Sequence, residues 1–90
     1  MAEIKWLPEA LADFERLYIF LRDKNPEAAM RAAAALLEGA DLLATMPQLG
    51  RPMGDDTHRR ELFIPFAGGA YVLRYREDDR GAVVIIRVWH

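Results

Sequence analysis

Cysteine and serine are both absent from this chain of 90 residues. The absence of cysteine excludes a disulfide framework and a thiolate metal site. The absence of both residues excludes nucleophilic catalysis by a serine or cysteine side chain. The only histidines, His58 and His90, lie far apart in the chain and do not show the ligand spacing of a metal site. We therefore expect neither a metal nor a cofactor.

Long apolar runs are absent as well. No stretch approaches the roughly 20 residues needed to span a bilayer, and the N-terminus lacks the basic and apolar regions of a signal peptide. These features predict a cytoplasmic protein with no membrane partner. A length of 90 residues predicts one domain, residues 1–90, near the lower limit for folding on a single core. Domains of this size often gain stability by binding a partner chain.

The chain also lacks an excess of basic residues. The chain has 12 lysine and arginine residues against 14 acidic residues, which gives a net charge of −2. A general nucleic-acid binder usually carries a clear positive excess, because phosphate neutralisation supplies most of its affinity. We therefore expect no direct, sequence-specific binding of nucleic acid. The second half of the chain contains no lysine, and its cations are arginines.

Apolar residues at three- and four-residue spacing predict an amphipathic helix that follows a short strand at Glu3–Trp6. Pro8 suits the first turn of this helix, which should end near Asp23–Lys24. Asp13 is expected to lie off its apolar stripe. A second helix is predicted from Asn25 to Ala44, because asparagine can cap a helix and the proline after it fits the first position. The short connection between the two helices predicts an antiparallel hairpin.

Three strands with regular alternation are predicted in the last third of the chain, at Arg60–Phe66, Gly68–Arg76 and Gly81–His90. The preceding segment, Met46–Pro52, is predicted to be an irregular loop. Short turns containing glycine make the three strands antiparallel neighbours. The predicted fold class is therefore α+β, in the order β-α-α-β-β-β, with an α-helical hairpin packed on one face of an antiparallel sheet. The last strand is apolar on both faces until Arg87, which predicts an interior position.

The arginines in and beside these strands, together with the C-terminal histidine, are the candidate target-binding residues. They are Arg59, Arg60, Arg74, Arg76, Arg87 and His90. Arginines that converge on one sheet face could bind phosphate or an acidic peptide, since the guanidinium group suits both. Alternatively, each arginine is solvated and pairs with an acidic neighbour across the ladder. The histidine could act as a general base or could simply be exposed at the end of the chain.

Six segments in order along nearly the whole chain resemble the RelE/ParE superfamily of bacterial toxins, and within it the ParE branch. The segments are Trp6 with Pro8–Ala10 and Asp13, Tyr18 with Asn25–Ala29, Met46–Pro52, Arg60–Leu62, Tyr71–Tyr75 and Ile86–His90. ParE toxins are thought to trap DNA gyrase on cleaved DNA without acting as nucleases. The resemblance thus implies a type II toxin with no catalytic residues, whose target is DNA gyrase.

The resemblance also implies a ParD-like antitoxin, bound to the toxin in a hetero-oligomer. The first helix offers plausible antitoxin contacts along its apolar stripe, at Leu11, Phe14, Tyr18 and Leu21. The nuclease branch carries basic residues around the turn before the Tyr71 strand, where this chain has the uncharged segment Phe66–Gly69. Two alternatives remain open: a ribosome-dependent mRNA endonuclease of the RelE type, and an inactive remnant that only binds its antitoxin.

Overall fold

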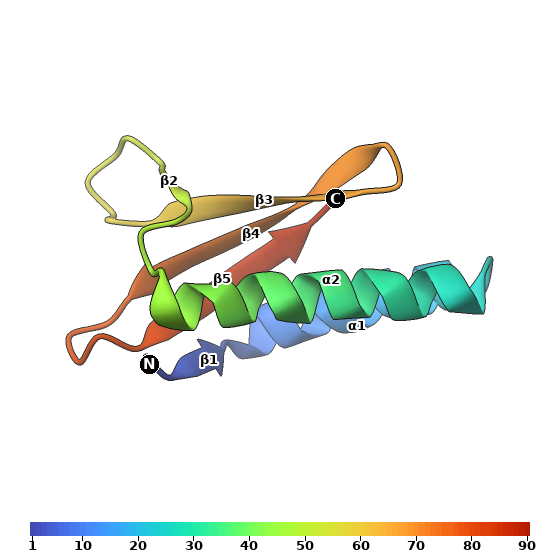
Figure 1. The fold of residues 1–90 in the computed structure, drawn as a ribbon, viewed down its shortest axis with the longest axis horizontal. Helices are drawn as coiled ribbons and strands as arrows, with labels where there is room; N and C mark the ends of the chain where they lie inside the picture. Colours follow the sequence, from blue (N-terminus) through green and yellow to red (C-terminus); the bar gives the residue numbers. More distant parts are fainter.

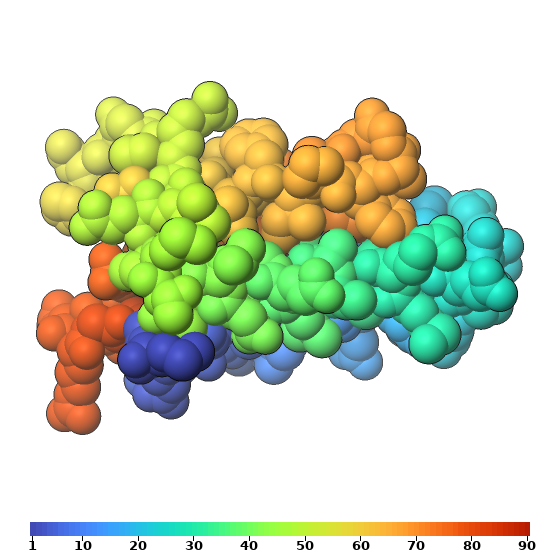
Figure 2. All heavy atoms as spheres, viewed as in Figure 1, coloured from blue at the N-terminus to red at the C-terminus, as the bar shows by residue number.

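Two helices cover one face of a five-stranded sheet in the computed structural model, which describes residues 1–90 (Figure 1). In chain order the elements are β1 (Ile4–Trp6), α1 (Pro8–Arg22), α2 (Pro26–Thr45), β2 (Arg51–Pro52), β3 (Arg60–Phe66), β4 (Gly69–Glu77) and β5 (Val83–Trp89). The strand order is β1-β5-β4-β3-β2. The molecule is elongated, 40 × 23 × 21 Å, and the turn between β4 and β5 projects from one end beside the N-terminus (Figure 2). The predicted α+β class with a helical hairpin is confirmed.

The sheet is mixed, which corrects the prediction of a purely antiparallel sheet. β1 pairs in parallel with β5, with Ile4 opposite Val83, whereas every other pair is antiparallel. A parallel neighbour requires a long crossover, which the chain between β1 and β5 supplies. The predicted loop also contains β2, where Pro52 is tolerated because this strand lies at the edge of the sheet. β5 lies between β1 and β4, so its predicted interior position is confirmed.

The two helices begin where the sequence predicts. Asn25 caps α2, because its side-chain oxygen accepts hydrogen bonds from the backbone N–H groups of Glu27 and Ala28. Buried alanines along α2 let it lie close against α1 and the sheet. Gly39 is buried on the same face, and a Cβ there would lie 2.6 Å from Cδ1 of Ile64 on β3. The glycine therefore weakens the helix locally but permits the close approach of α2 to the sheet. Neither helix is both long and apolar enough to cross a membrane.

The core lies between the helices and the sheet. Its largest buried side chains include Leu36 and Leu43 of α2 and Leu73 and Tyr75 of β4. The expected alternation along β4 holds. Tyr71, Leu73 and Tyr75 face the core, whereas the residues between them face away from the helices. The face of the sheet that is turned away from the helices is called the open face below.

A β-bulge interrupts the alternation on β5. Arg74 lies opposite Arg87, whereas the next residue of β4 lies opposite Ile85, so Ile86 has no partner on β4. The expected strict alternation is therefore wrong beyond Ile86. Val88 rather than Arg87 joins the core, and Arg87 shares the open face with Arg74.

Candidate functional site

A row of charged side chains crosses four strands of the open face. Arg51 of β2 lies opposite Glu61 of β3, which lies opposite Arg74 of β4, which lies opposite Arg87 of β5. We call these four residues the charged row. Residues directly opposite each other in an antiparallel ladder point to the same face and can interact. The sheet thus brings Arg74 and Arg87 together and adds Arg51, which sequence reasoning did not select because a two-residue strand gives no periodic signal.

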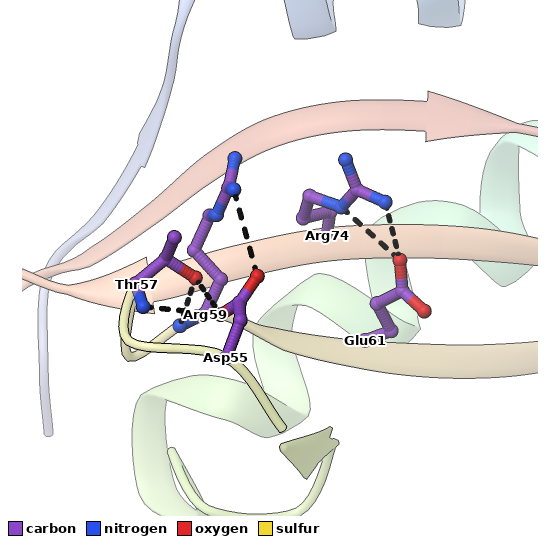
Figure 3. Close-up of polar contacts among 5 residues, drawn as sticks. All are labelled: Asp55, Thr57, Arg59, Glu61 and Arg74. Carbon is purple, nitrogen blue, oxygen red and sulfur yellow. Dashed lines mark hydrogen bonds and ion pairs between the residues drawn. The ribbon is translucent and has the colours of Figure 1, made fainter. Parts of the chain in front are cut away.

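Exposed aromatic rings support two cations of the charged row. The guanidinium group of Arg74 lies 4.8 Å from the ring centroid of Trp89, and that of Arg51 lies 5.3 Å from the ring of Phe63. Arg74 also donates from Nε and Nη2 to Oε2 of Glu61, at 3.1 and 2.7 Å (Figure 3). A cation held over an aromatic face keeps its charge but loses rotamer freedom. The open face therefore presents ordered guanidinium groups beside apolar surface.

The carboxylate of Asp13, on α1, forms an ion pair with the guanidinium group of Arg87. Although expected to lie off the apolar stripe, Asp13 is only 2% exposed, which corrects that expectation. Its carboxylate accepts hydrogen bonds from Nε and Nη2 of Arg87, at 2.7 and 3.0 Å, and from the backbone N–H of Val88, at 2.9 Å. Arg16 donates to the same carboxylate. The hydrogen bond from Arg87 is the main cause of the lowered pKa of Asp13, and it raises the pKa of Arg87 in return.

The position of Asp13 explains its burial. It lies three residues after the buried Ala10 and four before Leu17, on the side of α1 that faces β5. β1 pairs with β5 only as far as Ile85, so the edge of β5 is open beyond that point. The carboxylate of Asp13 takes the place of a strand partner at this edge, because it accepts a hydrogen bond from the N–H of Val88. An acidic residue at an apolar helix position is the sequence signal that could have identified this contact.

The other predicted target-binding residues lie elsewhere. Arg60 points to the helical side and donates from Nη1 to the backbone carbonyls of Gln48 and Gly50. Arg59 lies in the loop before β3 and its side chain extends across β4, on the same side of the sheet as Arg74 (Figure 3). Arg76 is exposed near the end of β4. His90 packs against Tyr71, with 5.1 Å between ring centroids, at the other end of β4. The six residues therefore do not form one continuous surface.

Apolar side chains remain exposed on α1. Of the four predicted antitoxin contacts, Leu11 is 52% exposed, whereas Phe14, Tyr18 and Leu21 are partly covered. Phe20 is 60% exposed. It lines a groove of about 600 Å³ between α1 and the end of β5. The groove also contains Leu17, Ile19, Val88, Trp89 and His90, and its charged residues are two acidic and two basic ones, Asp13, Asp23, Arg16 and Arg87. Sequence reasoning did not select Ile19, because it lies off the apolar stripe of α1. It did not select Trp89 as a neighbour of α1, because Trp89 lies in β5.

The chemistry available to these surfaces is the binding of anionic and apolar groups. Arg74 and Arg87 each have a carboxylate partner, which orients them but also neutralises part of their charge. No group of three or more histidine, aspartate or glutamate residues is arranged to hold a metal ion. The charged row therefore offers oriented cations, and the groove beside α1 offers apolar surface.

Comparison with known proteins gives consistent matches over at least 90% of the chain. The family model described as "ParE toxin of type II toxin-antitoxin system, parDE" matches residues 4–90. Toxin RelE1 of Caulobacter vibrioides is 41% identical over 81 residues, which cover 90% of this chain and 84% of that toxin. Toxin RelE3 of the same organism is 37% identical over 90 residues, which cover 100% of this chain and 95% of that toxin.

A solved structure has the same fold. The chain described as "Chromosomal ParDE TA system from P. aeruginosa" matches with a TM-score of 0.75 at 20% sequence identity. The match covers 98% of this chain and 94% of that chain. The order of two helices and a sheet is therefore shared with a structure from a toxin–antitoxin system.

Proposed function

Because this chain belongs to the ParE toxin family of type II toxin–antitoxin systems, we propose that it inhibits DNA gyrase by binding it, without catalysis. A cognate ParD-like antitoxin neutralises the toxin in a hetero-oligomer, and both events take place in the cytoplasm. The observation that carries the proposal is the pairing of Arg74 and Arg87 on the open face with carboxylates, together with the contact of Arg74 with the ring of Trp89.

Phosphodiester cleavage without a metal needs cations that are free to meet developing charge and a base that removes a proton. Arg74 is bound to Glu61, and Arg87 is bound to the buried Asp13. These pairs orient the guanidinium groups but leave less of their charge for a transition state. Ordered cations beside exposed aromatic rings are typical of surfaces that bind another macromolecule. Gyrase binding through the open face is therefore favoured over cleavage of RNA.

A ribosome-dependent mRNA endonuclease of the RelE type is the second candidate. Its support is that two curated relatives with at least 37% identity are named RelE. The third candidate, an inactive remnant that only binds an antitoxin, has no observation in its favour beyond the family match.

Gyrase and translation assays run side by side distinguish these candidates. The purified chain is expected to inhibit gyrase supercoiling, or to increase gyrase-dependent DNA cleavage, at micromolar concentration, and to leave mRNA intact in a translation extract. Arg74→Gln should raise the half-inhibitory concentration about tenfold, which corresponds to the loss of roughly 1.4 kcal/mol of binding. Arg80→Gln, an exposed arginine in the turn after β4, is the matched control and should change nothing.

Cleavage of mRNA at ribosomal A-site codons, with gyrase unaffected, would replace gyrase inhibition by the endonuclease function. An effect in neither assay, for a chain that still binds its antitoxin, would leave only the inactive remnant.

For the antitoxin we propose that an amphipathic segment binds the exposed apolar face of α1 and enters the groove beside β5. Leu11 and Phe20 offer apolar contact area to such a segment. A segment that folds on binding would also add stability to a small domain.

Phe20→Ala is expected to weaken antitoxin binding about tenfold, because truncation of an exposed aromatic anchor typically costs more than 1 kcal/mol. Leu42→Ala is the control, since Leu42 is similarly apolar and exposed but lies near the far end of α2. Hydrogen exchange should show slower exchange of α1 amides in the complex. Unchanged protection of α1, or equal affinity of the two variants, would contradict this docking surface.

A further inference from the structure

A cavity of about 330 Å³ lies at the end of the sheet where the loop between β2 and β3 meets the last residues of β4. Three arginines line it, Arg59, Arg60 and Arg76, together with His58. We propose that this cavity is a binding site for a phosphate group. It is separate from the charged row, and the proposal does not depend on which macromolecule the toxin inhibits.

The positive charge of the cavity is only partly neutralised. Arg60 and Arg76 form no ion pair, and Nη2 of Arg59 lies 4.0 Å from Oδ2 of Asp55, at the limit for an ion pair. Asp55 and Glu77 also line the cavity, so its lining contains three arginines and two acidic residues. Oδ1 of Asp55 accepts hydrogen bonds from the backbone N–H and the hydroxyl of Thr57, which fix the position of the carboxylate but do not neutralise it. The surplus charge therefore suits a ligand with one or more negative charges.

One donor in the cavity lacks a partner altogether. The Nε atom of Arg59 is buried and makes no hydrogen bond, and it is the only buried side-chain nitrogen or oxygen in the chain in this condition. A buried donor without an acceptor is destabilising, and such groups call for an explanation in each structure. Rotation of the Arg59 side chain toward the cavity would expose this donor, and an oxygen of a bound anion would then accept its hydrogen bond. In Figure 3 the side chain of Arg59 extends from the loop over β4, with Asp55 and Thr57 at its base.

The walls of the cavity are held by hydrogen bonds that do not involve a ligand. The hydroxyl of Tyr75 accepts from the N–H of Gly50, at 2.8 Å, and donates to the carbonyl of Pro47, at 2.7 Å. Arg60 uses Nη1 for the carbonyls of Gln48 and Gly50, which leaves its other nitrogens free of hydrogen bonds within the chain. A cavity with fixed walls binds an anion without the cost of ordering the loop.

The geometry favours phosphate over carboxylate. A carboxylate is matched by a single guanidinium group through two parallel hydrogen bonds, whereas a phosphate offers oxygens to several donors at once. Three arginines from the loop, β3 and β4 provide such a set. Inorganic phosphate, a nucleotide and a nucleic-acid backbone share this chemistry, and binding to a backbone phosphate would not depend on base sequence.

The test is a titration followed by NMR of the arginine side-chain Nε–H resonances. Sodium phosphate is added to the folded chain, and sodium acetate at equal ionic strength serves as the comparison. Phosphate should shift the Arg59 resonance with saturation, and acetate should not. Arg59→Gln and Arg76→Gln should each weaken phosphate binding about tenfold, since each removes charge-assisted hydrogen bonds. Arg31→Gln, an exposed arginine on α2, is the control and should bind phosphate as the unaltered chain does.

Arg76 is exposed, so its substitution should change the backbone spectrum only near residue 76, keep the fold and report on binding. A short single-stranded oligonucleotide and a nucleoside monophosphate are titrated in parallel. If the oligonucleotide binds more tightly than phosphate, and Arg76→Gln removes this preference, the ligand is a nucleic-acid backbone. If phosphate or the nucleoside monophosphate binds more tightly, the ligand is a free phosphate compound. Equal shifts with acetate, or equal phosphate affinity in the Arg76 and Arg31 variants, would overturn the proposal.

Discussion

Asp13→Ala is expected to lower the free energy of unfolding by about 3 kcal/mol. The buried carboxylate accepts hydrogen bonds from two guanidinium nitrogens of Arg87 and from the N–H of Val88. Its removal leaves the buried N–H unpaired, at a cost of roughly 1–3 kcal/mol, and also loses hydrogen bonds to a charged group. Urea denaturation monitored by circular dichroism measures the change, and the slope against urea should stay constant.

Glu15→Ala is the control for Asp13→Ala, because Glu15 lies on the same helix but is exposed and forms no ion pair. Its effect should stay within about 0.5 kcal/mol. Asp13→Asn should fall between the two, since the amide oxygen can still accept from Val88 while the amide nitrogen cannot accept from Arg87. A loss below 1 kcal/mol for Asp13→Ala would show that the carboxylate does not hold α1 against β5.

The same contact predicts how stability depends on pH. The pKa of Asp13 is lowered in the folded chain, mainly by the hydrogen bond from Arg87, so between this lowered pKa and about pH 5 the unfolded chain binds more protons at this site than the folded chain. The contribution is complete above roughly pH 5 and is lost as the pH falls through the folded pKa. The difference in stability between the unaltered chain and Asp13→Asn should therefore narrow below about pH 4. A constant difference down to pH 3 would contradict this account.

Gly50→Ala should destabilise the chain by about 2–3 kcal/mol. A Cβ at this position would lie 2.6 Å from Cε1 and 2.7 Å from the hydroxyl oxygen of Tyr75, whose side chain is fully buried. The aromatic ring cannot bend away, so either the loop or β4 must shift, and overpacking of this kind costs roughly 1–3 kcal/mol. The shift would also strain the hydrogen bond from the N–H of Gly50 to Tyr75.

The control for Gly50→Ala is Leu49→Ala, a truncation at the neighbouring, largely exposed position. It should cost less than about 1 kcal/mol. Thermal and urea unfolding of both variants provide the measurement. Because Gly50 also positions the carbonyl that Arg60 binds, phosphate binding at the cavity should weaken together with stability in Gly50→Ala. Stability within 0.5 kcal/mol of the unaltered chain would mean that the loop accommodates the methyl group freely.

The helices were predictable because their signals are local. The cap at Asn25, the proline after it and the apolar spacing of α1 act within one or two turns, and the structure begins both helices accordingly. The parallel pairing of β1 was not predictable in this way. Its partner β5 lies at the other end of the chain, and a three-residue strand carries no mark of its neighbour.

The same difference between local and long-range signals decides which features of the binding residues could be predicted. The sequence by itself determined the fold class, the helical hairpin, the arginine-bearing strands and the family pattern, because propensity and periodicity act over short distances along the chain. Only the tertiary structure decided which arginines lie together and what neutralises them. Arg87 meets Asp13 across 74 residues, through a bulge at Ile86, and Arg51 joins the row through a strand of two residues. Such contacts depend on strand register and packing, which no local pattern encodes.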